Sequence, residues 1–283
     1  MNMIDCHIHM LLDGAYWKDA IARHTLTPDE AFIHKVLAAY QRQGYTYLRD
    51  GGDRWSAGKR ARELAPQYGI RYRTPLSPLC KKGHYGAFIG EVYADLGEYA
   101  ALVQKMRAQG ADFIKIMISG LMDFDCFGRL TEPGLDADEI GQLIHIAHEE
   151  GFPVMAHANG GRTAQAAAAA GVDSIEHGAY LDEEALAAMV ENGTVWVPTL
   201  STVVNLQGKG RFNEAAVRAI AADTCEKLEQ FARMGGLIAC GSDAGAWAVP
   251  HGCDTELGHL RQALGADADA IIARGNQAIM EKF

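Results

Sequence analysis

The chain has 283 residues, of which 48% are hydrophobic, and this content is enough for a large core. It carries 26 Lys and Arg against 36 Asp and Glu, a formal net charge of -10, which argues against a nucleic-acid partner. The six cysteines form no CxxC pair, the N-terminus has no basic segment before an apolar run, and no uncharged apolar run reaches about 18 residues, so we expect a cytoplasmic protein outside the membrane.

Short apolar runs alternate with helical stretches along the chain. We predict eight strands, at residues 3–8, 45–50, 71–76, 112–118, 153–157, 173–177, 194–200 and 237–241. The predicted helices lie near 28–43, 56–68, 97–109, 137–150, 162–170, 182–192 and 214–234, followed by a split pair over 254–281. Glycines such as Gly44, Gly110 and Gly151 stand just before strands, where a helix ending in a left-handed residue favours glycine.

Short turns before the strands and long loops after them predict an α/β fold of the (β/α)8 TIM barrel type, with the functional face at the carboxyl ends of the strands. The long connections are 8–27, 77–96, 119–136 and 200–213. A doubly wound open sheet is the alternative, but no GxGxxG follows the first strand. Since no linker interrupts the pattern, we expect residues 1–283 to form a single barrel domain.

Candidate metal ligands stand at the ends of five predicted strands. They are His7 and His9 in IDCHIHM, Lys115 in DFIKIMIS, His157 in PVMAHANG, His177 in SIEHG and Asp243 in ACGSDAG. A single His-x-His pair is weak evidence, because 11 histidines in this chain give about 0.4 such pairs by chance. Each residue alone has a structural alternative, such as a helix N-cap for Asp243. Five strand ends of one barrel together predict a metal centre, because imidazole and carboxylate bind divalent cations.

Lys115 is the least expected member of the set, because it lies within a strand that should be fully buried. Burial disfavours the ammonium and favours the neutral amine, which can react with carbon dioxide. The resulting carbamate could bridge two metal ions. The alternative is a buried lysine paired with a carboxylate.

The other histidines can be sorted by their place in the predicted barrel. His84 and Tyr85 after the third strand, and His251 after the eighth, are candidate substrate contacts at the barrel mouth. We expect the remaining histidines to be surface or packing residues, and these are His24, His34, His145, His148 and His259.

In chain order, the segments HIH, FIK, HA, EHG and SDAG resemble the amidohydrolase superfamily, in its branch with a carboxylated lysine and two metals. YLRDGG, KKGHYG and SDAGAWAVPHG are similar to the imidazolonepropionase-related, prolidase-type group, which includes acyl-amino-acid carboxypeptidases. The resemblance covers residues 3–265. Members usually carry an accessory β-sandwich, which we do not expect here, so a homo-oligomer could cover the barrel ends. The segment GLMDFDCFGRL also departs from the family pattern.

The resemblance implies a metal-dependent hydrolase that uses a binuclear centre and a bridging hydroxide to cleave a C–N amide bond of a small molecule. His7, His9 and Asp243 would hold one metal, and His157 and His177 the other, with carboxylated Lys115 between them. Asp243 would also move the proton. We expect zinc, with manganese, nickel or iron as alternatives.

An N-acyl amino acid or dipeptide is the favoured substrate, with its carboxylate near Arg129, Lys209 or Arg211. Lactones and cyclic amides are alternatives at the same centre. A mononuclear deaminase would need a glutamate just after the fifth strand, and HANGG offers none. The third alternative is a barrel that binds a partner without catalysis. A very low metal content would distinguish it from a metal-dependent enzyme.

Overall fold

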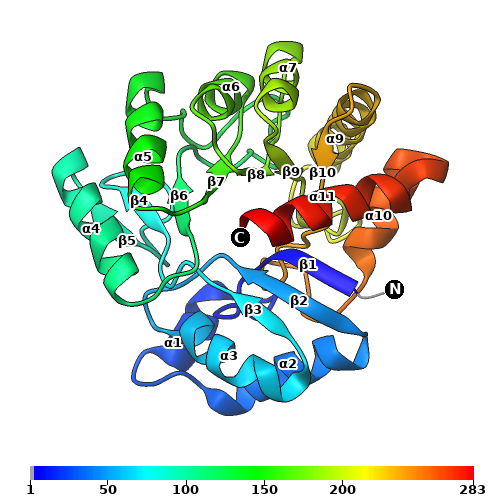
Figure 1. The fold of residues 1–283 in the computed structure, drawn as a ribbon. Coiled ribbons are helices and arrows are strands. Elements are labelled where there is room, and N and C mark those ends of the chain that lie inside the picture. Colours follow the sequence, from blue (N-terminus) through cyan, green and yellow to red (C-terminus); the bar gives the residue numbers. More distant parts are fainter. Residues whose placement is uncertain (1–2) are drawn as a thin grey trace.

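All strand pairs are parallel in residues 3–283, the part of the chain that the computed structural model describes. They form a sheet of order β1-β2-β3 and a sheet of order β10-β9-β8-β7-β6-β4-β5 (Figure 1). The strands are β1 Met3–Ile8, β2 Tyr45–Asp50, β3 Arg71–Arg73, β4 Leu79–Lys81, β5 Glu91–Tyr93, β6 Ile114–Met117, β7 Val154–Ala158, β8 Ser174–His177, β9 Val195–Val197 and β10 Leu237–Ile238.

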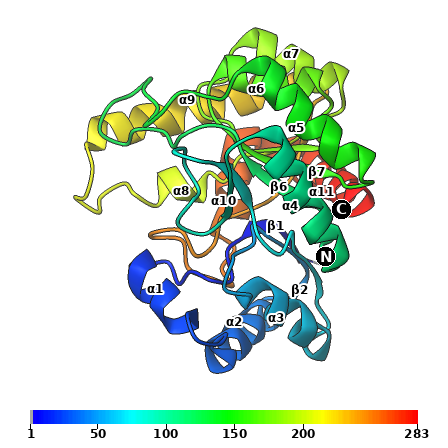
Figure 2. The ribbon, with the colours of Figure 1, turned by 90° about the vertical axis from the view of Figure 1, so that its left-hand side faces the viewer.

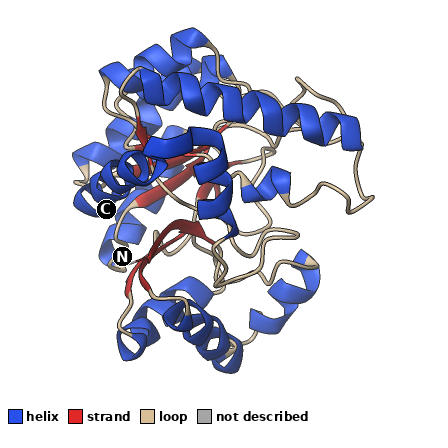
Figure 3. Ribbon diagram, turned by 90° about the vertical axis from the view of Figure 1, so that its right-hand side faces the viewer, coloured by secondary structure: helices blue, strands red, loops and turns tan. Residues whose placement is uncertain are grey.

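Helices surround the strands, as Figure 3 shows. They are α1 Trp17–His24, α2 Glu30–Arg42, α3 Ala57–Leu64, η1 Ala65–Tyr68, α4 Leu96–Ala108, α5 Ala137–Glu149, α6 Gly161–Ala169, α7 Glu183–Glu191, α8 Ser201–Val204, α9 Glu214–Arg233, α10 Thr255–Leu264, η2 Gly265–Asp267 and α11 Ala268–Lys282. The predicted helices are all present. Two short ones, α1 and α8, were not predicted, because they lie within the long connections. In the described residues, no helix is both long and apolar enough to cross a membrane.

Hydrogen bonds join the two sheets at both of their shared edges. The amide of Cys6 in β1 donates to the carbonyl of Cys240 after β10, over 2.8 Å. At the other edge, the amide of Asp112 before β6 donates to the carbonyl of Thr74 after β3, over 3.0 Å. A ring of strands requires contacts of this kind at both edges, so the arrangement agrees with the predicted barrel.

The third barrel strand is split, which differs from the continuous strand predicted at 71–76. Its first half, β3, pairs with β2, and its second half, β4, pairs with β6. Pro75 and Pro78 stand between the halves and have no amide hydrogen to donate to a neighbouring strand. The next connection adds β5 to the free edge of β4. Every strand in residues 3–283 belongs to these parallel sheets, so no β-sandwich lies in this part of the chain.

Side chains alternate between the barrel interior and the helix layer, as the strand period requires. In β6, Ile114 and Ile116 belong to the large core cluster beneath the outer helices. Phe113, just before β6, belongs instead to a smaller cluster with Met155 and with Phe283 after α11. The rings of Phe113 and Phe283 are 5.2 Å apart. This apolar layer fills the interior at the amino ends of the strands.

Helix α11 lies against β10 and β1 (Figure 1), and a glycine allows its close approach. A Cβ atom at Gly275 would lie 2.1 Å from the carbonyl oxygen of Ile238 in β10. Gly275 therefore fixes the distance between this helix and the barrel.

We predict that Gly275→Ala lowers the free energy of unfolding by about 1–3 kcal/mol, because the added methyl group forces the helix away from β10. Urea unfolding followed by circular dichroism measures the change. Gly258→Ala is the matched control, since Gly258 is an exposed glycine in α10 with nothing within 4 Å of its Cβ position. The control should be neutral or slightly stabilising. Equal destabilisation by both changes would contradict this account of the helix contact.

Candidate metal centre

The six residues predicted as metal ligands line one cavity of about 560 Å³ at the carboxyl ends of the strands. They are His7, His9, Lys115, His157, His177 and Asp243. All six side chains belong to buried residues. The structure therefore brings together residues that are up to 236 positions apart, between His7 and Asp243.

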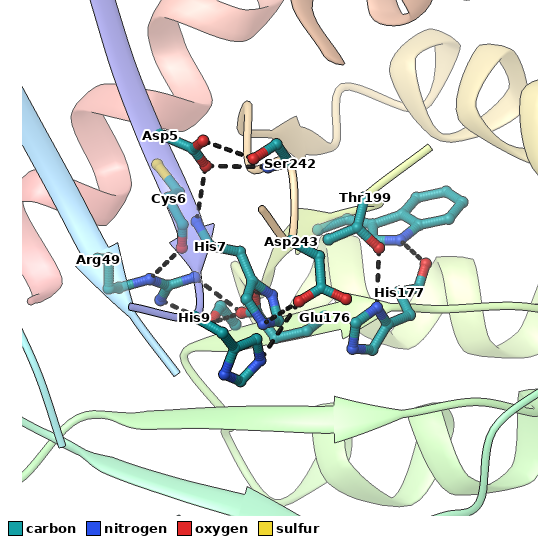
Figure 4. Close-up of polar contacts among 12 residues, drawn as sticks. Asp5, Cys6, His7, His9, Arg49, Glu176, His177, Thr199, Ser242 and Asp243 are labelled. Atoms are coloured by element: carbon teal, nitrogen blue, oxygen red, sulfur yellow. Dashed lines mark hydrogen bonds and ion pairs between the residues drawn. The ribbon is translucent and has the colours of Figure 1, made fainter. Parts of the chain in front are cut away.

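Asp243 contacts both His7 in β1 and His9 just after it (Figure 4). Its Oδ1 is 3.5 Å from Nε2 of His7 and 3.3 Å from Nε2 of His9. The ring centroid of His177 is 5.2 Å from that of His7 and 4.6 Å from that of His157. Single ligand atoms of His7, His177 and Asp243 all lie within 4.8 Å of one another, so a metal ion could be held by these three. This grouping crosses the predicted division between a first and a second metal.

Two of the candidate ligands have a left-handed backbone, which is uncommon for residues other than glycine. The φ angle is 68° at His177 and 58° at Asp243. Neighbouring hydrogen bonds hold both positions: the Asp243 amide donates to the His7 carbonyl over 2.7 Å, and Nε1 of Trp196 donates to the His177 carbonyl over 2.9 Å. Strain of this kind persists only where the surroundings enforce it, and it is concentrated at functional sites.

Burial keeps the histidines of the site neutral. It lowers the pKa of His9 and of His157 to about 3, and it holds the pKa values of His7 and His177 well below the usual value. The positive charge of Lys115 adds to this effect at each ring. A neutral imidazole retains the lone pair that a metal ligand needs.

Lys115 has no direct partner for its charge. Burial lowers the pKa of its ammonium group to about 8, and Nζ has no hydrogen-bond partner among the described residues. Burial likewise raises the pKa of the Asp243 carboxyl. The unpartnered Oδ1 of Asp243 and Nε2 of His7 fit a site for divalent cations, because a bound cation would satisfy both atoms. The predicted alternative of a lysine paired with a carboxylate has no ion pair to support it in residues 3–283.

A buried ion pair beneath His7 was not predicted. The guanidinium Nη2 of Arg49 in β2 donates to Oε1 of Glu176 in β8 over 2.8 Å, and both side chains are fully buried. The other carboxylate oxygen of Glu176 lies 2.8 Å from Nδ1 of His7 (Figure 4). A ring hydrogen on Nδ1 would face this carboxylate oxygen and would leave the lone pair on Nε2, toward Asp243.

Hydrogen bonds also orient the rings of His157 and His177. Nε2 of His157 lies 3.1 Å from the carbonyl oxygen of Gly120, to which it donates, so Nδ1 carries the lone pair. Nδ1 of His177 lies 2.8 Å from the hydroxyl of Thr199, which leaves Nε2 toward the cavity. These partners fix ring orientation, as residues around metal ligands commonly do.

Only some of the predicted substrate contacts line the cavity. Tyr85 lines the cavity, with its ring centroid 4.9 Å from that of His157. His84 lies 3.9 Å from Glu132, and Arg129 lies 3.7 Å from Asp123. Neither His84 nor Arg129 is among the lining residues.

His251 is also absent from the cavity wall. Its Nε2 donates to the carbonyl of Leu12 over 2.9 Å, and its Nδ1 lies 3.2 Å from the hydroxyl of Tyr40. These contacts tie the loop after β10 to the loop after β1 and to α2. Of the cations expected to meet a substrate carboxylate, Arg211 lines the cavity and Lys209 does not.

We predict that Arg49→Met lowers the free energy of unfolding by about 3–5 kcal/mol, because it leaves the Glu176 carboxylate buried without its cation. The shift of the urea midpoint, read by tryptophan fluorescence, measures the loss. Arg60→Met is the control, since Arg60 pairs with Glu30 and Glu63 at the surface, where such pairs contribute little. A midpoint for Arg49→Met that matches the control would show that the buried pair is not needed.

Comparison with known proteins places the chain in a family. Residues 3–273 match the amidohydrolase family, so the chain belongs to it. The ochratoxinase of Aspergillus niger is 26% identical over 324 aligned residues, which include 97% of this chain and 65% of the relative. The chain thus spans slightly less than two thirds of that relative's length.

Solved structures share the fold. A Xaa-Pro dipeptidase with methionine in its active site superposes with a TM-score of 0.80 at 22% identity, over 99% of this chain and 75% of the other. A prolidase in complex with N-methylphosphonate-L-proline has a TM-score of 0.70 at 27% identity, over 99% and 72%. The crystal structure of A. niger ochratoxinase has a TM-score of 0.76 at 22% identity, over 98% and 68%. The predicted TIM-barrel fold is confirmed.

Proposed function

We propose that this protein hydrolyses the C–N amide bond of a small substrate at a divalent metal centre. The observation that carries the proposal is that four histidines, Lys115 and Asp243 are buried together in the wall of one cavity. Membership of the amidohydrolase family supports it, as does similarity to an ochratoxinase and to prolidases. In the reaction, water adds to the carbonyl carbon and the C–N bond breaks, which gives an acid and an amine.

We infer that these residues hold two divalent ions, although one possible grouping, His7, His177 and Asp243, crosses the division given next. His7, His9 and Asp243 would hold one, His157 and His177 the other, and carboxylated Lys115 would lie between them. Divalent ions at such a site polarise the scissile carbonyl and lower the pKa of a bound water. Zinc suits a set of imidazoles and carboxylates, and manganese, nickel and iron also use such ligands.

Asp243 is the proposed proton carrier. Its carboxylate lies at the buried end of the cavity, where Oδ1 has no hydrogen-bond donor among the described residues. It accepts a proton from the attacking water and delivers it to the leaving nitrogen. Glu176 and Thr199 keep the neighbouring rings in place during this transfer.

An N-acyl amino acid or a dipeptide is the favoured substrate class. The prolidase and dipeptidase neighbours support an amide between two small units. A lactone or cyclic amide would present a similar carbonyl to the same residues and is the second candidate. With a lactone, Asp243 would deliver the proton to the leaving oxygen, and with a cyclic amide to the leaving nitrogen.

We predict that Asp243→Asn reduces kcat about 100-fold or more, because the amide cannot accept the proton, while asparagine keeps the left-handed backbone. The assay screens dipeptides, N-acyl amino acids and lactones with enzyme reconstituted with zinc and bicarbonate. Metal content is measured in parallel by elemental analysis, since Asp243 is also a candidate ligand.

Asp269→Asn is the matched control, since Asp269 is an exposed carboxylate that pairs with Arg261. Unchanged turnover in Asp243→Asn with metal retained would refute the proton-carrier role. Wild-type protein that holds almost no metal after reconstitution would instead support a silent binding barrel.

A further inference from the structure

Away from the candidate metal ligands, the cavity wall carries two groups of aromatic side chains. One group contains Trp17 and Phe88, whose ring centroids are 5.3 Å apart, together with Tyr85 at 5.8 Å from Phe88. These residues come from α1 and from the connection after β4. An aromatic wall favours flat or large apolar groups in a ligand.

A second aromatic group is built from three different loops. The rings of Phe124 and Phe212 are 5.0 Å apart, and those of Phe212 and Trp247 are 6.2 Å apart. All three residues line the cavity. Figure 2 shows α1 and α8 on the same side of the molecule, which is the side where the long loops gather.

Arg211 lies on this second group. Its guanidinium carbon is 4.4 Å from the ring centroid of Trp247 and 5.2 Å from that of Phe212. It is the sole arginine that lines the cavity within residues 3–283, and none of the ion pairs found there involves it. Stacking on an aromatic face holds the planar guanidinium while its N–H edge stays available for a carboxylate.

Two acidic residues also line the cavity, Asp123 and Asp125, and both have local partners. Oδ1 of Asp125 accepts a hydrogen bond from the amide of Asn213 over 2.8 Å. Oδ1 of Asp123 accepts from the amide of Asp125 over 3.0 Å, and Oδ2 of Asp123 lies 3.7 Å from Arg129. The bond from Asn213 joins the loop after β6 to the loop that carries Arg211. These acids therefore shape the wall, and Arg211 keeps its charge for a ligand.

We propose that Arg211 binds the carboxylate of the substrate, and that the wall of Phe124, Phe212 and Trp247 contacts an aryl or large apolar group. The preferred substrates are then amides that carry both a free carboxylate and an aryl group. This inference rests on the proposed amide hydrolysis for its kinetic test. The binding test below is independent of turnover.

The kinetic test compares N-benzoyl-L-phenylalanine with its carboxamide, which lacks the negative charge. In Arg211→Met we expect KM for the acid to rise about 10- to 100-fold with kcat within about 3-fold, because a charge-assisted hydrogen bond to the ground state is lost. The carboxamide should be affected less than about 3-fold by the same change. Lys209→Met is the control, since Lys209 is an exposed cation two residues away that does not line the cavity.

Calorimetric binding of N-benzoyl-L-phenylalanine, with zinc-reconstituted protein, tests Arg211 even if no compound is cleaved. We expect Arg211→Met to bind it about 10- to 100-fold more weakly than wild type and Lys209→Met. Equal affinities in the three proteins, or no binding to wild type, would overturn the role of Arg211. Binding that depends on Arg211 without hydrolysis of any library member would support this inference and refute the proposed function.

The aromatic wall has a separate test. Wild type should prefer N-benzoyl-L-phenylalanine over N-acetyl-L-alanine by about 10-fold or more in kcat/KM, and Phe124→Ala should reduce this preference. Phe127→Ala is the control, because Phe127 is an exposed aromatic residue of the same loop that does not line the cavity. A preference that is absent in wild type, or unchanged in Phe124→Ala, would overturn the aryl assignment.

Discussion

The barrel interior must bury charged groups next to an apolar layer, and the pair of Arg49 and Glu176 makes this arrangement feasible. The pair lies between Phe283 at the amino ends of the strands and His7 at the carboxyl ends: the Arg49 guanidinium carbon is 4.4 Å from the Phe283 ring, and Glu176 contacts His7. An isolated charge in this position would be very costly, whereas a paired and hydrogen-bonded one is tolerated. Among the candidate metal ligands, His7 is the one whose ring contacts this pair.

Much of the fold was predictable because the sequence pattern is local. Apolar runs alternate with amphipathic helices that end at glycines, and this pattern located each barrel strand. The candidate ligands followed from their place at the strand ends. Lys115 gave the sharpest signal, since a lysine within a run of isoleucines requires a chemical explanation. The same signal was present at Arg49 in YLRDGG and at Glu176 in SIEHG, yet these were not recognised as partners. Spacing along the chain does not reveal which residues of β2 and β8 meet inside a barrel.

The cavity wall could not be predicted, because it arises from loops without periodicity. Trp17, Phe124, Phe212 and Trp247 are far apart in the sequence, and only the folded loops bring the last three together. The same limitation explains His251, which stands near the expected mouth but bonds to Leu12 and Tyr40 instead. The break between β3 and β4 had a visible cause in Pro75 and Pro78, although the pairing of β5 beyond it did not.

The left-handed backbone at His177 and Asp243 restricts how this centre could change during evolution. Among residues other than glycine, those with short polar side chains adopt this conformation most readily, and β-branched residues adopt it least. A new side chain at either position must therefore suit the left-handed backbone as well as the neighbouring candidate ligands. Phe124, Phe212 and Trp247 in the loops of the cavity wall do not have a left-handed backbone, so their side chains are free of this restriction. The candidate metal centre is therefore more restricted in sequence than the loops that form the cavity wall.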